Sequence, residues 1–295
     1  MLSALSRIVL SRRVLSRRVL SRGVVSRAVL AAVAGAGAAA LCLSAAPGAT
    51  AAPAAAKGVV VIVPGQQLYA DAAANEQTFR PLADGIRAAG YRVVFAHAGG
   101  RDVAADAQLV KKVVDAEAAG ADRVGIVAHS AGGLGTRHYL KFLGGSEWVD
   151  EYVAIGTAQY GSAGGCSQPR DGGYDTCMYA DAIKKLNAGP DAPGPTRYSV
   201  VQSDGEWSDG RLDGIPQCRA YSPVPLANTG FDHVIEMRDP TIIRNVVTSL
   251  RGGCAGRVVT EPVDSIDWKS TLFPGIVGAA GDALRDAIPA VVPER

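Results

Sequence analysis

The sequence predicts an α/β domain with a mainly parallel central sheet that is covered by helices on both faces. Residues 58–63 (GVVVIV) and 123–128 (RVGIVA) are short, mostly apolar runs rich in β-branched side chains. Such runs are typical of strands that are buried on both faces. Between them lie segments with apolar residues at helical spacing. Strands that alternate with helices form βαβ units, and these units build a parallel sheet.

Each element follows from its own pattern and ending. The predicted strands are residues 58–63, 91–96, 123–128, 149–155 and 197–202, and the predicted helices are residues 79–89, 103–119 and 131–143. The first two helices are followed by Gly90 and Gly120, and glycine readily adopts the left-handed conformation that ends many helices. In open parallel sheets, ligands bind beyond the carboxyl ends of the strands. The expected functional loops are therefore residues 64–70, 129–133, 156–178, 203–215 and 227–234.

The first 51 residues predict an export signal. They carry seven arginines and no acidic residue, followed by an apolar stretch over residues 28–43 and by the small residues Ala49-Thr50-Ala51. The alternative is a membrane anchor, but this stretch is shorter than the roughly 20 residues of a spanning helix and rich in glycine and alanine. We expect cleavage near Ala51, no stable membrane insertion, and a secreted domain at residues 52–295. Residues from about 255 onward are expected to form a C-terminal extension of that domain.

The basic character of the whole chain comes from this leader. The chain has 30 basic and 28 acidic residues, and without the leader 23 basic residues face the same 28 acidic ones. The expected mature domain is therefore mildly acidic, and no nucleic-acid partner is expected.

Four cysteines follow the leader, namely Cys166, Cys177, Cys218 and Cys254. An even number in an exported protein predicts two disulfides. Three pairings are possible, and we favour Cys166–Cys177 and Cys218–Cys254. The alternative, a metal site, would need a CxxC pair or a nearby histidine cluster, and the sequence has neither. No metal and no cofactor are expected.

The stretch around Ser130 predicts a nucleophile elbow. Residues 124–133 (VGIVAHSAGG) place a buried strand, a tight turn and a helix in direct succession, with Ser130 at the centre of an A-x-S-x-G pattern. Ala128 and Gly132 leave room for the strand and the helix to pass close together. The alternative is an ordinary helix start in which Ser130 is the N-cap.

The phrase VAHSAGGLGTRHYLKFLGG resembles the elbow of the secreted bacterial class 2 triacylglycerol lipases, and IGTAQYGS at residues 155–162 is similar to the loop that follows their next strand. The resemblance covers residues 58–163 well and 197–251 more loosely. It implies the α/β-hydrolase fold and a serine lipase or esterase. Ala158 stands where this loop usually has proline.

A serine nucleophile needs a histidine base and a carboxylate that orients the histidine, and in this fold they follow the serine in the order acid, then histidine. His233 is the only histidine in a late loop. His97, His129 and His138 are expected to be packed in the protein or exposed to solvent, without acting as the base.

The acid is expected in the loop after the strand at 197–202. The resemblance favours Asp209, because the related lipases place their acid several residues beyond the strand with an apolar residue three positions later, here Leu212. The alternatives are Asp204, Glu206 and Asp213.

The oxyanion hole needs two backbone amides, one from the residue after the serine and one from the loop after the first strand. Ala131 supplies the first. The resemblance implies Gln66 for the second, although Pro64 replaces the usual histidine of that loop.

These observations predict a secreted serine esterase or lipase that forms an acyl-enzyme on Ser130 and acts as a monomer on a small-molecule or lipid ester. Two alternatives stay open. An acyltransferase would use the same serine chemistry, and an inactive hydrolase fold would serve as a binding module.

Overall fold

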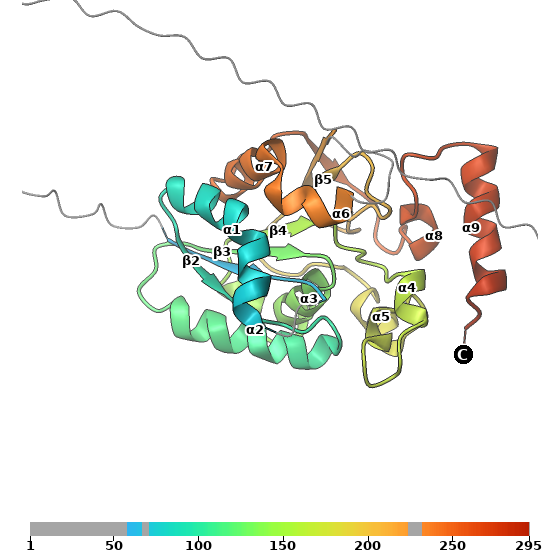
Figure 1. Ribbon diagram of the computed structural model, residues 1–295, viewed down its shortest axis with the longest axis horizontal. Helices are drawn as coiled ribbons and strands as arrows, with labels where there is room; N and C mark the ends of the chain where they lie inside the picture. The colour runs from blue at the N-terminus through green and yellow to red at the C-terminus, as the bar shows by residue number, and fades with distance from the viewer. Residues whose placement is uncertain (1–57, 67–70, 224–231, 295) are drawn as a thin grey trace, which may run out of the picture. The chain divides into compact units, whose positions relative to one another are not determined.

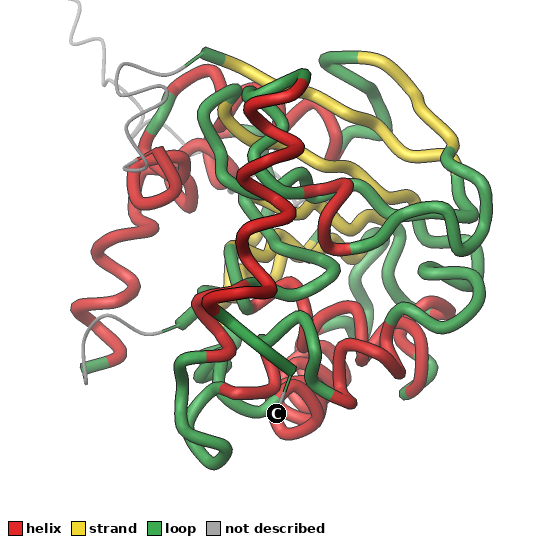
Figure 2. The backbone as a smooth tube through the Cα atoms, turned by 90° about the vertical axis from the view of Figure 1, so that its right-hand side faces the viewer, coloured by secondary structure: helices red, strands yellow, loops and turns green. Residues whose placement is uncertain are grey.

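The computed structural model describes residues 58–66, 71–223 and 232–294. Seven strands form one sheet in the order β2-β1-β3-β4-β5-β6-β7 (Figures 1 and 2). Their bounds are Val59–Val63 (β1), Arg92–Phe95 (β2), Val124–His129 (β3), Glu151–Ile155 (β4), Arg197–Ser203 (β5), Pro216–Ser222 (β6) and Arg257–Thr260 (β7). All neighbouring strands are parallel except β6 and β7, which pair antiparallel. The predicted mainly parallel sheet is confirmed.

Helices cover both faces of the sheet, as the sequence predicted. On one face α1 (Ala72–Ala88) and α7 (Pro240–Leu250) pack on Val60 and Ile62 of β1. On the other face α2 (Val103–Glu117) and α3 (Gly132–Phe142) pack on the alternate residues of the same strand (Figure 1). Successive side chains of a strand point to opposite faces, so an all-apolar strand such as β1 contributes to both layers of the core.

Polar caps fix where the main helices begin. The carboxylates of Asp71, Asp102 and Asp239 each accept a hydrogen bond from a backbone amide in the first turn of α1, α2 and α7. These amides have no partner inside the helix, and an N-cap of this kind contributes about 1 kcal/mol. In α7 the cap is followed by Pro240, whose missing N–H costs nothing at the first helical position.

The remaining elements are short, apart from α9. They are η1 (Gly145–Glu147), α4 (Ala163–Cys166), η2 (Tyr174–Thr176), α5 (Asp181–Leu186), α6 (Asp232–Ile235), η3 (Glu236–Arg238), α8 (Trp268–Thr271) and α9 (Ala279–Val291). Disulfides join Cys166 to Cys177 and Cys218 to Cys254. These are the pairings that the sequence analysis favoured.

The residues from 255 onward contribute a strand to the sheet and pack against the segment that contains α4 and α5. Strand β7, at the start of the expected C-terminal extension, adds an edge strand to the sheet that the sequence analysis did not predict. Farther on, Trp268, Ile288 and Val292 pack against the apolar cluster that holds α4 and α5.

The predicted leader, residues 1–51, lies outside the described residues. Within the part that the structure describes, no helix is both long and apolar enough to cross a bilayer.

Candidate active site

Ser130 lies in a strained turn between β3 and α3. Its φ is +55°, which is unusual for a residue other than glycine and costs roughly 1–3 kcal/mol. Two glycines let α3 begin close to the sheet, because a methyl group on Gly132 would lie 2.6 Å from the carbonyl oxygen of Val63, and one on Gly133 would lie 2.4 Å from Thr157. The N-cap alternative for Ser130 is wrong, since the helix is capped at Ala131 without a side-chain hydrogen bond.

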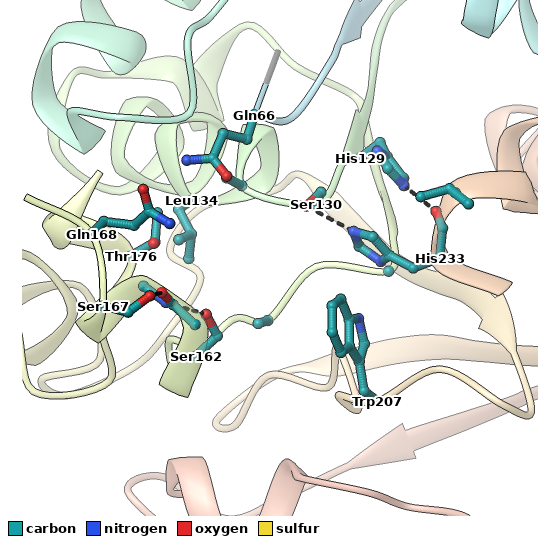
Figure 3. A pocket seen from close by; sticks show the side chains of 16 residues that line it. Gln66, His129, Ser130, Leu134, Ser162, Ser167, Gln168, Thr176, Trp207 and His233 are labelled. Atoms are coloured by element: carbon teal, nitrogen blue, oxygen red, sulfur yellow. Dashed lines mark hydrogen bonds between the residues drawn. The ribbon is translucent and has the colours of Figure 1, made fainter. Parts of the chain in front are cut away.

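Three side chains form a hydrogen-bonded chain at this turn. Ser130 Oγ lies 2.9 Å from Nε2 of His233, a contact that Figure 3 shows. Nδ1 of His233 lies 2.9 Å from Oε2 of Glu206. Ser130 follows β3, Glu206 follows β5, and His233 lies in α6, so elements far apart in the sequence bring them together. Since the carboxylate accepts at Nδ1, that nitrogen carries the proton and Nε2 is free to accept the serine proton.

The carboxylate at Nδ1 of His233 belongs to Glu206 and not to the predicted Asp209. Asp209 is buried but faces away from the imidazole, towards β6 and its own loop. Its carboxylate accepts from Arg211 Nε at 2.7 Å and from Arg219 at 2.9 Å, and it also accepts from the hydroxyl of Tyr221. These cations and this donor already neutralise the charge of Asp209.

The other two alternatives do not reach His233 either. Asp204 is exposed to solvent. Asp213 is buried, and its carboxylate faces the backbone amide of Ile266 at 3.4 Å. Of the four acidic residues in this loop, the structure places Glu206 alone at the imidazole.

His129 supports the backbone of His233. Its Nε2 lies 2.9 Å from the carbonyl oxygen of His233, and its ring packs edge-on against Phe79. A carbonyl can only accept, so Nε2 of His129 carries a proton. The sequence analysis expected His129 to be packed or exposed to solvent. The structure shows that it is packed and that it also forms this hydrogen bond.

Both histidines are held in the neutral form at neutral pH. Burial, together with the neighbouring His233, lowers the pKa of His129 to about 3. Burial also lowers the pKa of His233 to about 4. A neutral imidazole at position 233 can accept a proton, which a general base requires.

The pKa of His129 predicts a pH dependence of stability. The unfolded chain binds a proton at His129 below about pH 6.5, whereas the folded chain resists it down to about pH 3, so the free energy of unfolding should fall with decreasing pH in this window. The slope from this one group approaches about 1.4 kcal/mol per pH unit. His129→Gln keeps a neutral donor, and should remove that part of the slope. Urea unfolding of both proteins between pH 4 and 7 measures the difference, and parallel curves would contradict the assignment.

The backbone amides of Ala131 and Gln66 lie close to the turn that carries Ser130. A methyl group on Gly65 would lie 2.6 Å from Ser130 Cβ and 3.1 Å from the Ala131 nitrogen, so the loop after β1 passes directly over the elbow. A methyl group on Gly100 would lie 2.8 Å from the Gln66 nitrogen. Within the described ranges, neither amide donates a hydrogen bond. Both are therefore available to an oxyanion.

A cleft of about 430 Å³ borders Ser130 and His233 (Figure 3). Glycine, alanine, serine, threonine and glutamine residues form most of its wall, and the larger apolar side chains are those of Leu134, Trp207 and Val234. Residues 162–176 supply one side of the wall, and the Cys166–Cys177 disulfide closes the loop that makes up most of this segment. The ring of Trp207 packs edge-on against His233 with centroids 5.4 Å apart. The cleft therefore leads directly to the serine and the imidazole.

One group of side chains in the described part of the chain has the spacing of metal ligands. His129, His233 and Glu236 offer ligand atoms within 4.8 Å of one another. Both ring nitrogens of His233, however, are hydrogen bonded to Ser130 and Glu206, and Nε2 of His129 is bonded to a carbonyl. We assign these atoms to the hydrogen-bond network.

Comparison with known proteins bears on the fold. No protein-family model matches the sequence, and no curated protein matches it. Aspergillus fumigatus lipase B superposes with a TM-score of 0.52 at 17% identity, over 80% of this chain and 61% of the lipase. Phospholipase PlaB from Legionella pneumophila gives a TM-score of 0.48 at 14% identity over 65% of this chain and 59% of its own, and the metagenomic carboxyl esterase MGS0156 gives 0.40 at 19% over 56% and 58%.

This chain spans about three fifths of the length of lipase B. At such identities the likeness concerns the backbone and not the activity. The mainly parallel seven-stranded sheet, the serine turn after β3 and the superposition on lipase B agree with one another. The chain therefore has the α/β-hydrolase fold.

Proposed function

We propose that the protein is a serine hydrolase that cleaves carboxylic esters through an acyl-enzyme. One observation carries the proposal: the strained Ser130, His233 and Glu206 are joined by two hydrogen bonds of 2.9 Å at the edge of a cleft. The proteins of similar structure include a lipase, a phospholipase and a carboxyl esterase, which agrees with an ester substrate.

In the first half of the reaction, Ser130 Oγ attacks the ester carbonyl carbon while His233 Nε2 takes the serine proton. A bond forms between Oγ and carbon, and the carbonyl oxygen becomes an oxyanion that accepts from the amides of Ala131 and Gln66. When the carbon–alkoxide bond breaks, the imidazolium gives its proton to the departing alcohol. The product is an acyl ester of Ser130.

In the second half, water attacks the acyl carbon and His233 takes one water proton. The bond to Oγ breaks, the proton returns to Ser130, and the carboxylic acid leaves. Glu206 holds the imidazole in the required tautomer and stabilises its positive charge in both halves.

We further propose that the chain is exported. The arrangement of basic, apolar and small residues in the first 51 positions supports this, as do the two disulfides.

The test uses the full chain, produced with its own leader in a secreting host and recovered from the medium. It is incubated with p-nitrophenyl esters of graded acyl length, with and without an added alcohol. We expect turnover that releases the free acid, and the small, partly polar wall of the cleft favours short acyl groups. Absence of turnover on every ester would favour the binding module, and transfer of most acyl groups to the alcohol would favour an acyltransferase. Retention of the protein in the cells would contradict export.

Gly156 offers a further test of the geometry, because its backbone packs against the acid and the base. Its φ is +52°, and a methyl group there would lie 2.8 Å from Glu206 Oε2 and 3.0 Å from His233 Nδ1. Gly156→Ala should displace these groups and lower kcat by about 100-fold, because small misplacements of catalytic groups have effects of this size. Steady-state kinetics measures the effect.

The matched control is Gly144→Ala. Gly144 has a φ of +78°, but a methyl group there would meet no atom within 4 Å. It isolates the cost of a left-handed backbone, about 1 kcal/mol of stability, with kcat unchanged. Equal losses of kcat in the two variants would contradict the packing argument.

A further inference from the structure

A second glutamate lies beside Glu206, whose carboxylate contacts His233. Glu236 in η3 is fully buried, and its carboxyl group lies close to that of Glu206. The two side chains meet over Gly156, since a methyl group there would lie 2.5 Å from Glu236 Oε2 and 2.8 Å from Glu206 Oε2. The two carboxyl oxygens therefore face each other across a glycine that leaves them room.

The two carboxyl groups have different sets of donors. Glu206 accepts from the amides of Trp207 and Ser208 and from His233 Nδ1. Glu236 Oε1 accepts from the amide of Ser203 at 2.5 Å, and Glu236 Oε2 has no donor within the described ranges. Two facing carboxyl oxygens need a proton between them, and the member with fewer donors binds it more readily.

The remaining charged and titratable groups around the pair do not supply a cation. Asp232 and His233 approach from α6, and His129 approaches from the end of β3. His129 and His233 are neutral at neutral pH, because burial lowers the pKa of each. Burial raises the pKa of Asp232, and burial and the charge of Glu206 together raise the pKa of Glu236. Two negative charges at this place would lack compensation.

We propose that Glu236 is a positioning residue of the active site: its carboxyl is protonated in the working enzyme and donates a hydrogen bond to the carboxylate of Glu206 that orients His233. The proposal rests on the proposed ester hydrolase function. The proton of Glu236 fixes the orientation of Glu206 and leaves a single negative charge on the pair. A donor to a carboxylate also favours its charged form, so Glu206 stays ionised to a lower pH than burial alone would allow.

Two substitutions of similar size separate this role from simple packing. Glu236→Gln retains a donor for Glu206 and an acceptor for the amide of Ser203, whereas Glu236→Leu removes both. We expect kcat of Glu236→Gln to stay within about threefold of wild type. We expect Glu236→Leu to lose about 10- to 100-fold in kcat with little change in KM, as is typical when a hydrogen-bonded support of a reacting group is removed.

The pH profile gives a readout that lost packing would not move. The acid limb of kcat/KM for a p-nitrophenyl ester should shift upward by about one pH unit in Glu236→Leu, because Glu206 loses the donor that favours its charged form, and should stay in place in Glu236→Gln. Glu151→Gln is the matched control. Glu151 is a buried glutamate at the end of β4 that lies away from Gly156, and it pairs with Arg123 and Arg197. Its substitution should therefore change the melting temperature but not the acid limb. An unshifted limb in Glu236→Leu, or equal losses of kcat in both Glu236 variants, would overturn the proposal.

Infrared spectroscopy tests the protonation state without any turnover. At pH 7 the wild-type protein should show the carbonyl stretch of a protonated carboxyl group that Glu236→Gln lacks. Identical spectra would overturn the proposal even if the protein hydrolyses esters. Conversely, absence of ester hydrolysis by the wild type together with the expected band would reject the proposed function and keep the proton on Glu236.

Discussion

Replacing Ser130 by alanine is expected to lower kcat for ester hydrolysis by a factor on the order of 10⁶, or roughly 8 kcal/mol of transition-state stabilisation. In the proposed mechanism the covalent bond to the acyl group forms at Ser130, which ends the hydrogen-bonded chain of Glu206 and His233. The fold should remain intact. We expect alanine to keep the same backbone conformation, including the unfavourable φ of +55° at position 130. Steady-state kinetics on a p-nitrophenyl ester measures the loss.

The matched control for this substitution is Ser265→Ala, which removes the hydroxyl of an exposed serine in the C-terminal part. It should hydrolyse the ester at the wild-type rate. Residual turnover of Ser130→Ala above a hundredth of the wild-type rate would show that another group attacks the ester.

Replacing Glu206 by glutamine should lower kcat by about 10⁴-fold, or about 5.5 kcal/mol. An amide can donate to Nδ1 of His233 and so favour the tautomer in which Nε2 carries the proton and cannot accept from Ser130. The change removes a charge at nearly constant volume, so the melting temperature should move little compared with kcat.

Asp209→Asn is the matched control, because both residues are buried acids of the same loop. Asp209 pairs with Arg211 and Arg219, and breaking such a pair should lower the free energy of unfolding by about 3 kcal/mol. Its kcat should stay within about tenfold of wild type when measured below the unfolding transition. A larger loss of kcat in Asp209→Asn than in Glu206→Gln would return the catalytic role to Asp209.

The elements that position the site were accessible to sequence reasoning for a simple physical reason. Strands β1 and β3 to β5 are buried in the middle of the sheet, so most of their residues are apolar, and the intervening helices show the spacing of an amphipathic face. The elbow was recognisable because a strand, a serine and small residues must follow one another where the chain turns so sharply. His233 followed by elimination among four histidines.

The acid could not be read from the sequence because four carboxylates lie within ten residues and any of them could reach a nearby imidazole. What decides between Glu206 and Asp209 is β6, which was not predicted. Its residues Arg219 and Tyr221 lie two positions apart, so their side chains share one face of the strand, and both donate to the carboxylate of Asp209. A strand with two half-buried polar residues on one face lacks the apolar pattern that marks the other strands, so the sequence did not reveal that Asp209 is neutralised.

The C-terminal part was also more closely connected to the site than its sequence indicated. The amide of Asp209 donates to the carbonyl of Thr271, and the amide of Phe273 donates to the carbonyl of Trp207. These two bonds hold the loop next to Glu206 against the C-terminal end of α8. Backbone hydrogen bonds of this kind depend on where a segment folds back and leave no mark in its side chains. The same is true of the pairing of β7 with β6.

The central claim is that the hydroxyl of Ser130 is activated by His233, and fluorophosphonate labelling followed by peptide mapping tests it most directly. The expected result is one phosphonyl group per chain, located on Ser130, and its near absence from a His233→Ala variant that is otherwise folded. An adduct on another serine, or equal labelling of Ser130 with and without His233, would contradict the claim.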